Sequence, residues 1–340
     1  MKVLVTGAAG FIGGQLWHTL WKRGDEVVGI DNFSYGNPDN LKFDDHDFGA
    51  EVRRMDIRDK AGMLALFEAE KFDVVYNIAG IAPLPDCQSD PVEAVSVNTL
   101  GLVNVLENAR RTGVKHVIQA STNAMYENET EFPTVESKFN PPTLIYPNTK
   151  YCGERFCQSF ADTYGMPTVV TNCSNNYGPY QFPEKLIPLF INNIRHKKPL
   201  PVYGKGENVR DWLYVEDHAR AIDLIFHNGK TADTYNIGGF NEWKNIDIIK
   251  VVIKTVDRLL GRAEGKDMNL ITYVTDRKGH DMRYAIDSRK LQRELGWEPS
   301  LQFEEGIEKT VRWYLDNQAW MDNVTSGGYQ KYYDEMYKNR

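Results

Sequence analysis

The sequence predicts an α/β protein built on a doubly wound parallel sheet, with a smaller α+β lobe beside it. Three observations lead to this fold class. Short apolar runs alternate with amphipathic helical patterns over the first half of the chain, as in successive βαβ units. The inner runs are almost continuously apolar, which is typical of strands covered by helices on both faces. The chain has 340 residues, of which 41% are hydrophobic, and this is long enough for two domains.

The first half of the chain supplies the strands and helices of the predicted sheet. Six apolar runs are predicted strands: Lys2–Thr6, Glu26–Asp31, Glu51–Met55, Asp73–Ala79, Val114–Ser121 and Thr168–Asn172. Four amphipathic patterns are predicted crossover helices: Phe11–Arg23, Lys60–Glu70, Pro91–Arg111 and Asn148–Tyr164. Because strand and helix alternate, the sheet should be wound with helices on both faces.

The rhythm changes from about Tyr177, where local βαβ repetition ends. Shorter strands are predicted at Leu200–Tyr203, Thr234–Ile237 and Leu270–Val274, and the stretches Tyr177–Pro183 and Gly204–Asn208 are rich in turn residues. We therefore expect a first domain over residues 1–175 and a second lobe mainly over residues 176–340, with some segments returning to the first domain. A ligand should lie in the cleft between them.

The charge and the cysteines exclude several classes of partner. The formal net charge is −7, whereas proteins that bind nucleic acids or membrane surfaces generally present a basic face, so we expect neither partner. Cys87, Cys152, Cys157 and Cys173 form no Cys-x-x-Cys pair and have no histidine at zinc-ligand spacing, so we expect free thiols and no metal. No secretion signal or membrane-spanning run is visible, which predicts a cytoplasmic protein.

A glycine-rich turn directly follows the first predicted strand. Gly7, Gly10 and Gly13 open the predicted helix. The first allows a tight turn, the second lets the backbone approach a pyrophosphate, and the third allows the helix to pack closely on the strand. Free N–H groups at the helix N-terminus then bind the anion. This pattern predicts a dinucleotide-binding Rossmann domain, and the turn lacks the Gly-Lys-Ser/Thr ending of loops that bind nucleoside triphosphates.

Acidic residues after the next two strands are placed for the adenosine end of a dinucleotide. Asp31 ends the second predicted strand, roughly 20 residues after the glycines, where a carboxylate accepts hydrogen bonds from a ribose diol. The following residues, Asn32, Phe33 and Ser34, include no arginine to meet a 2′-phosphate, so the sequence favours NAD over NADP. Asp56 follows the third predicted strand and is a candidate for contact with adenine.

A tyrosine and a lysine four residues apart stand at the start of the fourth predicted helix. At this spacing Tyr146 and Lys150 lie on one face of the helix. A phenol with a pKa of about 10 is a poor base at neutral pH, and a nearby ammonium stabilises its phenolate. Ser121 and Thr122 end a preceding strand and supply hydroxyl groups. Together with the glycine turn, these residues resemble those of the extended short-chain dehydrogenase/reductase family.

The second half of the chain resembles the dTDP-glucose 4,6-dehydratases within this family. The resemblance covers the whole chain and is densest from about Tyr164. Five runs carry it: Thr171–Pro188, Arg210–His218, Tyr235–Gly239, Asp276–Asp287 and Trp320–Tyr329. It implies an NAD-dependent enzyme that oxidises C4 of a nucleoside-diphosphate hexose, with a dTDP-hexose favoured. It also implies a homodimer, formed through helices such as Pro91–Arg111 and Asn148–Tyr164.

The resemblance further implies roles for individual residues. Tyr146, assisted by Lys150 and Thr122, takes the proton of the sugar C4 hydroxyl while hydride passes from C4 to NAD. The implied cofactor contacts are Gly7, Gly10, Phe11, Ile12, Gly13, Asp31, Asn32, Asp56, Ile57, Ala79, Tyr146 and Lys150. The implied substrate contacts are Asn123, Asn175, Lys185, Leu186, Arg210, Asn241, Arg277 and His280. Arginine suits a diphosphate because its planar fork pairs with two phosphate oxygens.

The sequence departs from the dehydratase pattern after Thr122. In the family an Asp and a Glu follow this threonine; the Asp protonates the departing C6 hydroxyl and the Glu removes the C5 proton. Here Asn123 and Ala124 stand at these positions, and neither is an acid or a base near neutral pH. Four nearby side chains are candidate substitutes: Asp86, Cys87, Glu127 and Glu129.

Three hypotheses follow from this departure. A dehydratase with a rearranged elimination step keeps the activity of the family. A C4 epimerase or a related oxidoreductase needs only Tyr146, Lys150 and NAD, because the keto sugar can turn over and be reduced on its other face. The third is a nucleotide-sugar binder without catalytic activity, although an intact Tyr146 and Lys150 pair would be superfluous in it.

Overall fold

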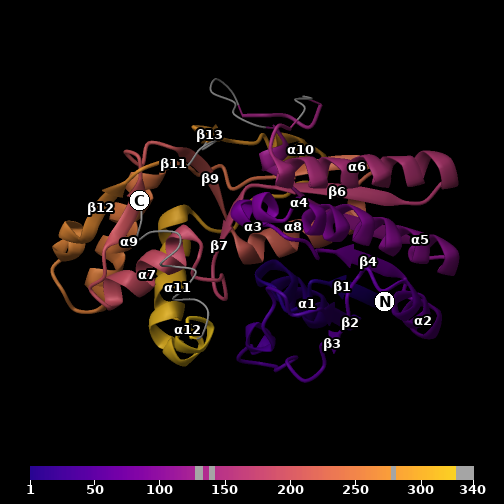
Figure 1. The fold of residues 1–340 in the computed structure, drawn as a ribbon, viewed down its shortest axis with the longest axis horizontal. Helices are drawn as coiled ribbons and strands as arrows, with labels where there is room; N and C mark the ends of the chain where they lie inside the picture. Colours follow the sequence, from indigo (N-terminus) through magenta and orange to yellow (C-terminus); the bar gives the residue numbers. More distant parts are fainter. Residues whose placement is uncertain (127–132, 138–141, 277–280, 327–340) are drawn as a thin grey trace.

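A seven-stranded parallel sheet forms the larger part of the structure (Figure 1). The computed structural model describes residues 1–126, 133–137, 142–276 and 281–326. In spatial order the strands are β10 (Asp233–Ile237), β6 (Thr168–Cys173), β5 (His116–Thr122), β4 (Val74–Asn77), β1 (Lys2–Thr6), β2 (Glu26–Asp31) and β3 (Arg53–Arg54). All neighbouring pairs are parallel, so the predicted parallel sheet is confirmed.

Helices cover both faces of this sheet. One face carries α1 (Phe11–Arg23), α8 (Val215–Asn228) and α10 (Arg289–Leu295). The other carries α2 (Lys60–Glu70), α3 (Leu84–Ser89), α4 (Pro91–Val95), η2 (Ser96–Gly101), α5 (Leu102–Thr112) and α6 (Ile145–Tyr164). Alternate residues of β1 show the division, because Val3 and Val5 pack with the first group and Leu4 packs with the second. The strands are therefore buried on both faces, as their apolar sequences predict.

The smaller lobe holds an apolar core of its own, and Figure 1 shows it on the left. Its main sheet has the order β11 (Glu242–Lys244), β9 (Val209–Tyr214) and β13 (Arg283–Tyr284), and β7 (Asn175–Tyr177) also pairs with β9. A two-stranded sheet pairs β12 (Ile271–Val274) with β8 (Leu200–Tyr203). Its helices are α7 (Leu186–Arg195), α9 (Asn245–Leu259), α11 (Phe303–Asp316) and α12 (Gln318–Val324). Short 3₁₀ helices lie at η1 (Pro38–Leu41), η3 (Asn123–Tyr126) and η4 (Lys266–Leu270).

The predicted helix Pro91–Arg111 is interrupted by a π-helical turn, η2, which separates α4 from α5. Within this turn the Asn98 side chain accepts the backbone N–H of Ile81 at 2.7 Å and donates to the Ile81 carbonyl at 3.0 Å. Its Nδ2 atom also donates to Thr149 Oγ1 on α6 at 2.9 Å. These bonds join the turn to segments that are distant in the sequence. Local periodicity does not record such contacts, and the sequence pattern therefore predicts one continuous helix.

Two predicted strands also differ from the structure. Thr234–Ile237 lies in the large sheet as part of β10, rather than in the smaller lobe. Its Tyr235 and Ile237 side chains are fully buried in the core that α1 and α8 cover. The predicted strand Glu51–Met55 is shorter, and only Arg53–Arg54 pairs with β2. In both cases the pairing between segments that are distant in the sequence decides which residues form the strand and which sheet it joins.

Three properties of the described residues bear on the predicted partners. Among the helices that the structure describes, none combines the length and the apolar character that a membrane crossing requires. Within the same ranges, no group of three histidine, cysteine, aspartate or glutamate side chains is arranged to hold a metal ion. All four cysteines are free thiols, as the sequence predicts.

Candidate active site

The glycine turn between β1 and α1 is tightly packed. Gly7 has a φ of +66°, in the left-handed region that favours glycine. A Cβ atom on Gly7 would lie 2.8 Å from the backbone of Ala79, which follows β4. A Cβ atom on Gly13 would lie 2.1 Å from the Gly7 carbonyl oxygen. Two of the predicted glycines are therefore required by close backbone contacts, and Ala79 lies directly against the turn.

The N-terminus of α1 is suited to bind an anion. Its N-cap residue is Gly10, so no side chain caps the first turn. The N–H groups of Phe11 and Ile12 belong to the first turn, where a helix leaves its donors without intrahelical acceptors. These donors and the helix dipole together favour a phosphate group. The turn thus fits the pyrophosphate of NAD.

Asp31 shapes the loop beside the glycine turn. Its Oδ2 atom accepts the Ala9 N–H at 3.0 Å, and its Oδ1 atom accepts the Phe33 N–H at 2.7 Å. Burial raises the pKa of Asp31, while these two hydrogen bonds and the charge of Arg54 favour the carboxylate. Each carboxylate oxygen can accept a second hydrogen bond, so the group can also bind a ribose diol.

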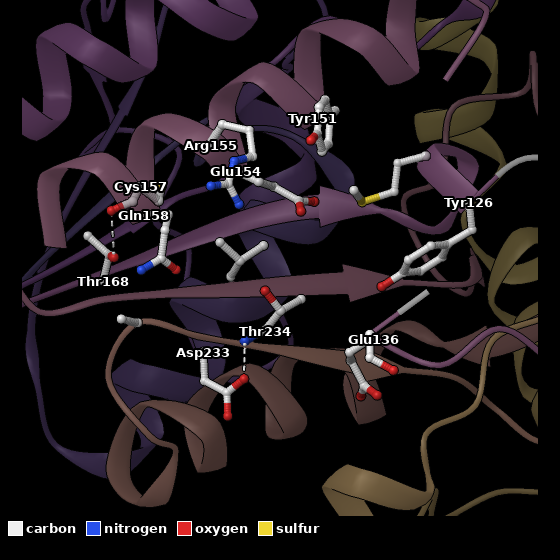
Figure 2. A pocket seen from close by; sticks show the side chains of 14 residues that line it. Tyr126, Glu136, Tyr151, Glu154, Arg155, Cys157, Gln158, Thr168, Asp233 and Thr234 are labelled. Carbon is white, nitrogen blue, oxygen red and sulfur yellow. Dashed lines mark hydrogen bonds between the residues drawn. The ribbon is translucent and has the colours of Figure 1, made fainter. Parts of the chain in front are cut away.

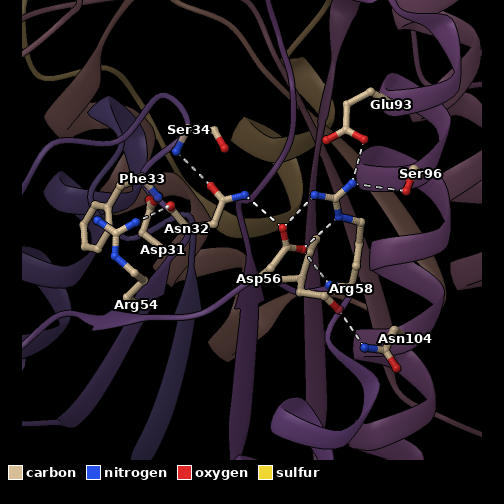
Figure 3. A network of polar contacts seen from close by, with 11 residues as sticks. Asp31, Asn32, Phe33, Ser34, Arg54, Asp56, Arg58, Glu93, Ser96 and Asn104 are labelled. Atoms are coloured by element: carbon tan, nitrogen blue, oxygen red, sulfur yellow. Dashed lines mark hydrogen bonds and ion pairs between the residues drawn. The ribbon is translucent and has the colours of Figure 1, made fainter.

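Asn32 connects this loop to Asp56 (Figure 3). The Asn32 Nδ2 atom donates to Asp56 Oδ2 at 3.0 Å. Arg58 also donates to both oxygens of Asp56, at 3.0 and 2.8 Å, and this pairing lowers the pKa of Asp56 to about 2. Ile57 is 5% exposed, and its carbonyl accepts a hydrogen bond from Asn104 at 2.6 Å. The predicted adenine-side residues therefore form one network, in which Arg58 is a member that the sequence prediction lacks.

An arginine lies beside Asp31, although none occurs in Asn32–Ser34. Strand register places Arg54 of β3 opposite Asp31 of β2. The Arg54 guanidinium stacks on the Phe33 ring at 4.7 Å and donates to the Asn32 carbonyl at 3.4 Å. The local sequence after Asp31 gives no sign of this neighbour. The preference for NAD therefore depends on the Asp31 carboxylate, which repels a 2′-phosphate.

Tyr146, Lys150 and Thr122 come together at the carboxyl end of β5. Tyr146 and Lys150 are one turn apart on α6, and Thr122 is the last residue of β5. The Thr122 side chain lies close enough to the Tyr146 hydroxyl to favour its phenolate form. Lys150 is 7% exposed, and its Nζ atom lies 3.8 Å from the position of a Cβ atom on Gly80. The structure thus brings the three predicted catalytic residues together beside the segment that packs on the glycine turn.

Burial controls the protonation of Tyr146 and Lys150. It raises the pKa of Tyr146, the thiols of Cys173 and Cys87 act in the same direction, and the nearby Thr122 side chain opposes them. Burial lowers the pKa of Lys150. Burial thus disfavours both the phenolate of Tyr146 and the ammonium of Lys150. Removal of the Tyr146 proton needs an acceptor as well as a neighbouring cation.

Asn123 and Ala124 lie in η3, directly after Thr122. Asn123 is 5% exposed, and its Nδ2 atom is buried without a hydrogen-bond partner among the described residues. Leaving such a donor unpaired costs about 1–3 kcal/mol, which a ligand that accepts this hydrogen bond would recover. Ala124 contributes its backbone N–H to Thr122 Oγ1 at 3.2 Å. The arrangement supports the predicted substrate contact of Asn123 and supplies no acid or base at either position.

The candidate substitutes for the lost carboxylates are differently placed. Asp86 Oδ2 accepts a hydrogen bond from the Tyr35 hydroxyl at 2.6 Å. Cys87 is buried, its thiol donates to a backbone carbonyl at 3.5 Å, and burial raises its pKa to about 11. Asp86 is thus bound to Tyr35, and the Cys87 side chain favours its thiol form. Glu127 and Glu129 lie outside the described residues.

Three predicted substrate residues meet around β9. Arg210 lies on this strand, and Asn175 of β7 is paired opposite Trp212. The Asn241 carbonyl accepts the Trp212 N–H at 3.1 Å, and the Asn241 N–H donates to Asp211 Oδ1 at 2.7 Å. The sheet of the smaller lobe therefore gathers side chains that are far apart in the sequence.

Arg210 is held in a fixed orientation. Its guanidinium donates to the carbonyls of Val209 at 2.7 Å and Asp281 at 2.9 Å. It also lies over the Tyr284 ring, 4.5 Å from the ring centroid. Arg210 is 5% exposed, so these contacts orient a buried cation.

The remaining predicted substrate residues have different outcomes. Lys185 is exposed at the N-cap of α7, and its Nζ atom pairs with Glu184 at 3.0 Å. Leu186 is the first residue of α7. Arg277 and His280 lie outside the described residues.

Sequence reasoning also missed Glu154, a half-buried residue on α6 (Figure 2). It lies one helical turn beyond Lys150 and lines a cavity of about 210 Å³. The available signal is its spacing, because Tyr146, Lys150 and Glu154 follow one another at intervals of four residues. Glu154 therefore lies on the same side of α6 as Tyr146 and Lys150.

Comparisons with known proteins agree with this geometry. A family model described as GDP-mannose 4,6 dehydratase matches residues 4–310. The dTDP-glucose 4,6-dehydratase of Salmonella typhimurium strain LT2 is 41% identical over 364 residues, which cover 100% of both chains. The similarity thus extends over the whole chain, as the distribution of motifs indicates.

Solved structures of two kinds of enzyme share the fold. DesIV, a dTDP-glucose 4,6-dehydratase from Streptomyces venezuelae with NAD bound, has a TM-score of 0.87 and 34% identity, covering 95% of this chain and 100% of that chain. A UDP-glucose 4-epimerase from Thermotoga maritima with UDP-glucose has a TM-score of 0.85 and 29% identity, covering 94% and 100%. The dehydratase has the higher identity of the two.

Asp31→Asn is expected to raise the NAD dissociation constant by about 10- to 100-fold, because a hydrogen bond to a charged acceptor contributes about 1.5–3 kcal/mol. Isothermal titration calorimetry with NAD measures the change. Asp44→Asn is the matched control, since Asp44 is exposed in the same part of the chain and the change in net charge is identical. Equal NAD affinity in the two variants would show that Asp31 does not contact the cofactor.

Proposed function

Because the chain belongs to the GDP-mannose 4,6-dehydratase family of NAD-dependent nucleotide-sugar enzymes, we propose that it oxidises C4 of a nucleoside-diphosphate hexose. The observation that carries this proposal is the position of Tyr146 and Lys150, one turn apart on α6, beside Thr122 at the end of β5. These side chains lie beside a turn that fits the pyrophosphate of NAD. A partly buried phenol that can exchange its proton beside a dinucleotide site is suited to the oxidation of an alcohol.

The chain supplies the proton chemistry of this reaction. When bound, NAD accepts the hydride that leaves C4. The glycine turn would hold the pyrophosphate and Asp31 the adenosine ribose. Tyr146 takes the proton of the C4 hydroxyl, and the nearby Thr122 side chain favours the phenolate form that can do so. Because burial disfavours a phenolate, the Lys150 cation is needed close to Tyr146 while that charge exists.

The smaller lobe is proposed to bind the nucleoside diphosphate. Arg210, Asn175 and Asn241 surround one stretch of β9, and the buried Arg210 cation suits a diphosphate. The Asn123 Nδ2 atom, which has no hydrogen-bond partner among the described residues, would donate to a sugar hydroxyl. A dTDP-hexose is the favoured substrate, in line with the names of the similar dehydratases.

Two outcomes are proposed after C4 oxidation. Elimination across C5 and C6 is the first, because the whole-chain similarity is greater to dehydratases than to the epimerase. Inversion at C4 is the second, because Asn123 and Ala124 supply no acid and no base, while Asp86 is hydrogen-bonded to Tyr35 and the Cys87 thiol to a backbone carbonyl. Inversion uses only the Tyr146 and Lys150 chemistry.

A homodimer is proposed through α4, η2 and α6. Large apolar side chains are exposed on these segments, among them Val92 at 78%, Leu100 at 60% and Phe156 at 40%. Burial of such a group against a second copy is favourable at about 25 cal/mol per Å² of apolar surface. We also propose a reducing, cytoplasmic setting, which the four free thiols support.

The reaction is tested by incubating the purified protein with NAD and dTDP-glucose and, in parallel, with UDP- and GDP-hexoses. NMR of the products separates a 6-deoxy-4-keto sugar, made by elimination, from a C4-inverted hexose. Tyr146→Phe should lower the rate of NAD reduction by a factor of about 10²–10⁴, the usual contribution of a general base. Tyr164→Phe, on an exposed tyrosine of the same helix, is the control. Unchanged turnover in Tyr146→Phe would exclude Tyr146 as the base.

The combined substitution Asn123→Asp and Ala124→Glu should increase elimination by about tenfold or more, because it restores an acid and a base beside Thr122. The ratio of 6-deoxy-4-keto product to C4-inverted product, measured by NMR, reports the change. Each single substitution serves as a control, since elimination needs both groups. If the double variant still reduces NAD but its product ratio matches wild type, the lost carboxylates do not decide the outcome.

Leu100→Asp is expected to convert the dimer into a monomer, because it places a charge in the proposed apolar contact. Sedimentation velocity gives the mass of each species. Tyr273→Asp is a matched control: Tyr273 is also 60% exposed but lies on β12 of the smaller lobe. A wild-type protein that sediments as a monomer, or a dimer disrupted equally by both variants, would contradict the proposed interface.

A further inference from the structure

A hydrogen bond joins two loops that lie on either side of the glycine turn. Tyr35, in the loop after β2, donates its hydroxyl proton to Asp86 Oδ2 on α3, which follows β4, at 2.6 Å. In the large sheet β1 lies between β4 and β2. The two loops therefore extend from the neighbours of β1, and the bond between them spans the carboxyl end of β1, where the glycine turn begins.

The loop that carries Tyr35 is bound to the glycine turn at both of its ends. Where the loop begins, Asp31 accepts the Ala9 N–H at 3.0 Å. Where it ends, the Asn37 N–H donates to the Ala9 carbonyl at 3.0 Å. Between these points Phe33 has a φ of +61°, in the left-handed region, so the chain turns sharply. Tyr35 thus lies on an arch that starts and finishes beside Ala9.

Asp86 lies on a segment that is held in place by other contacts. The next residue, Cys87, is fully buried, and its thiol donates to the Ile81 carbonyl at 3.5 Å. Asn98 binds both the N–H and the carbonyl of Ile81. Each loop is therefore anchored without the bond between Tyr35 and Asp86, so this bond is not needed to shape either of them.

The Tyr35 side chain can break this bond by rotating outward. It is 52% exposed, and among the residues that the structure describes its hydroxyl bonds only to Asp86. Burial raises the pKa of Tyr35, and the carboxylates of Asp86 and Glu184 act in the same direction, so the phenol keeps the proton that it donates. The connection across β1 thus depends on one hydrogen bond between an anchored acceptor and a side chain that can move.

We propose that Tyr35 and Asp86 form a clasp that closes over the pyrophosphate of bound NAD and slows the exchange of the cofactor. The inference rests on the proposed function, in which NAD binds at the glycine turn. While the bond is in place the dinucleotide neither enters nor leaves, so the bond must break for both. The proposal also gives Asp86 a role other than that of a substitute acid.

Both proposed outcomes of the reaction require that the reduced cofactor stays on the protein. Inversion returns the hydride to C4 of the same sugar. Elimination to a 6-deoxy-4-keto sugar removes only water overall, so the hydride taken from C4 must also return to the sugar. In each case NAD is regenerated and no other oxidant or reductant is consumed. Loss of NADH before the return would leave a keto hexose and an enzyme without its cofactor, and a slowly opening clasp prevents this loss.

The first experiment measures NADH binding and needs no sugar. Stopped-flow fluorescence gives the association rate constant, and displacement of NADH by excess NAD gives the dissociation rate constant. Tyr35→Phe keeps the ring and removes the bond, so both constants should rise by about 5- to 10-fold while the dissociation constant changes by less than about twofold. A hydroxyl that contacted the cofactor directly would instead change mainly the dissociation rate constant. The control is Tyr273→Phe, which removes an exposed hydroxyl from β12.

Asp86→Ala removes the acceptor of the same bond and should raise both constants by a similar factor. The double variant Tyr35→Phe with Asp86→Ala should be no faster than either single variant, because there is only one bond to lose. Wild-type rate constants in Tyr35→Phe, or effects of the two substitutions that multiply, would overturn the clasp while leaving the cofactor site intact. Wild type that binds no NADH would contradict the proposed function, and the clasp with it.

The second experiment follows cofactor loss during turnover. Protein loaded with NAD is incubated with dTDP-glucose, and the filtrate is assayed for NADH by fluorescence and for keto hexose by NMR. Tyr35→Phe and Asp86→Ala should both release several times more NADH per product than wild type, because the opened site loses the cofactor before the hydride returns. Loss of the 6-deoxy-4-keto product in Asp86→Ala alone, with no extra NADH in either filtrate, would instead identify Asp86 as an acid of the elimination.

Discussion

Parallel pairing places the carboxyl ends of five strands at one edge of the large sheet, and the whole candidate site depends on this constraint. The glycine turn follows β1, Asp31 ends β2, Ala79 follows β4, Thr122 ends β5 and Cys173 ends β6. Each strand is hydrogen-bonded to its neighbours and buried on both faces. These positions are therefore fixed relative to one another by the core. The loops add reactive groups to a rigid edge, which is a common arrangement in α/β enzymes.

The parts of the site that depend on local sequence could be predicted, and those that depend on distant pairing could not. The turn at Gly7 and the spacing of Tyr146 and Lys150 are local patterns, and the structure places both as expected. Arg54 reaches Asp31 only through the pairing of β3 with β2. Glu154 has a visible spacing, but its burial depends on the elements packed against α6. The pKa shifts of Tyr146 and Lys150 could not be predicted either. The spacing suggests that the lysine favours the tyrosine phenolate, but burial raises the pKa of Tyr146 and lowers that of Lys150.

Part of the motif that carries the resemblance in the smaller lobe is structural. Asp211 accepts the N–H groups of Gly239 and Asn241 at 2.8 and 2.7 Å, and so fixes the loop that carries Asn241. Asp217 accepts the Ser300 N–H at 2.8 Å. The similarity in Arg210–His218 therefore includes residues that hold the loops of the predicted substrate site as well as the predicted substrate residue Arg210. A single matching position in this motif is thus weaker evidence for substrate binding than the whole pattern.

The late position of β10 in the chain has a consequence for how the protein is made. The large sheet is complete only after residue 237, when the chain has already built β7, β8, β9, α7 and α8. Until then the edge of β6 exposes unpaired backbone groups, which in other sheets invite pairing with a foreign strand. Synthesis from the N-terminus therefore cannot finish one lobe before starting the other. A polypeptide cut between the lobes would lose a strand from the first, so the two lobes are expected to fold as one cooperative unit.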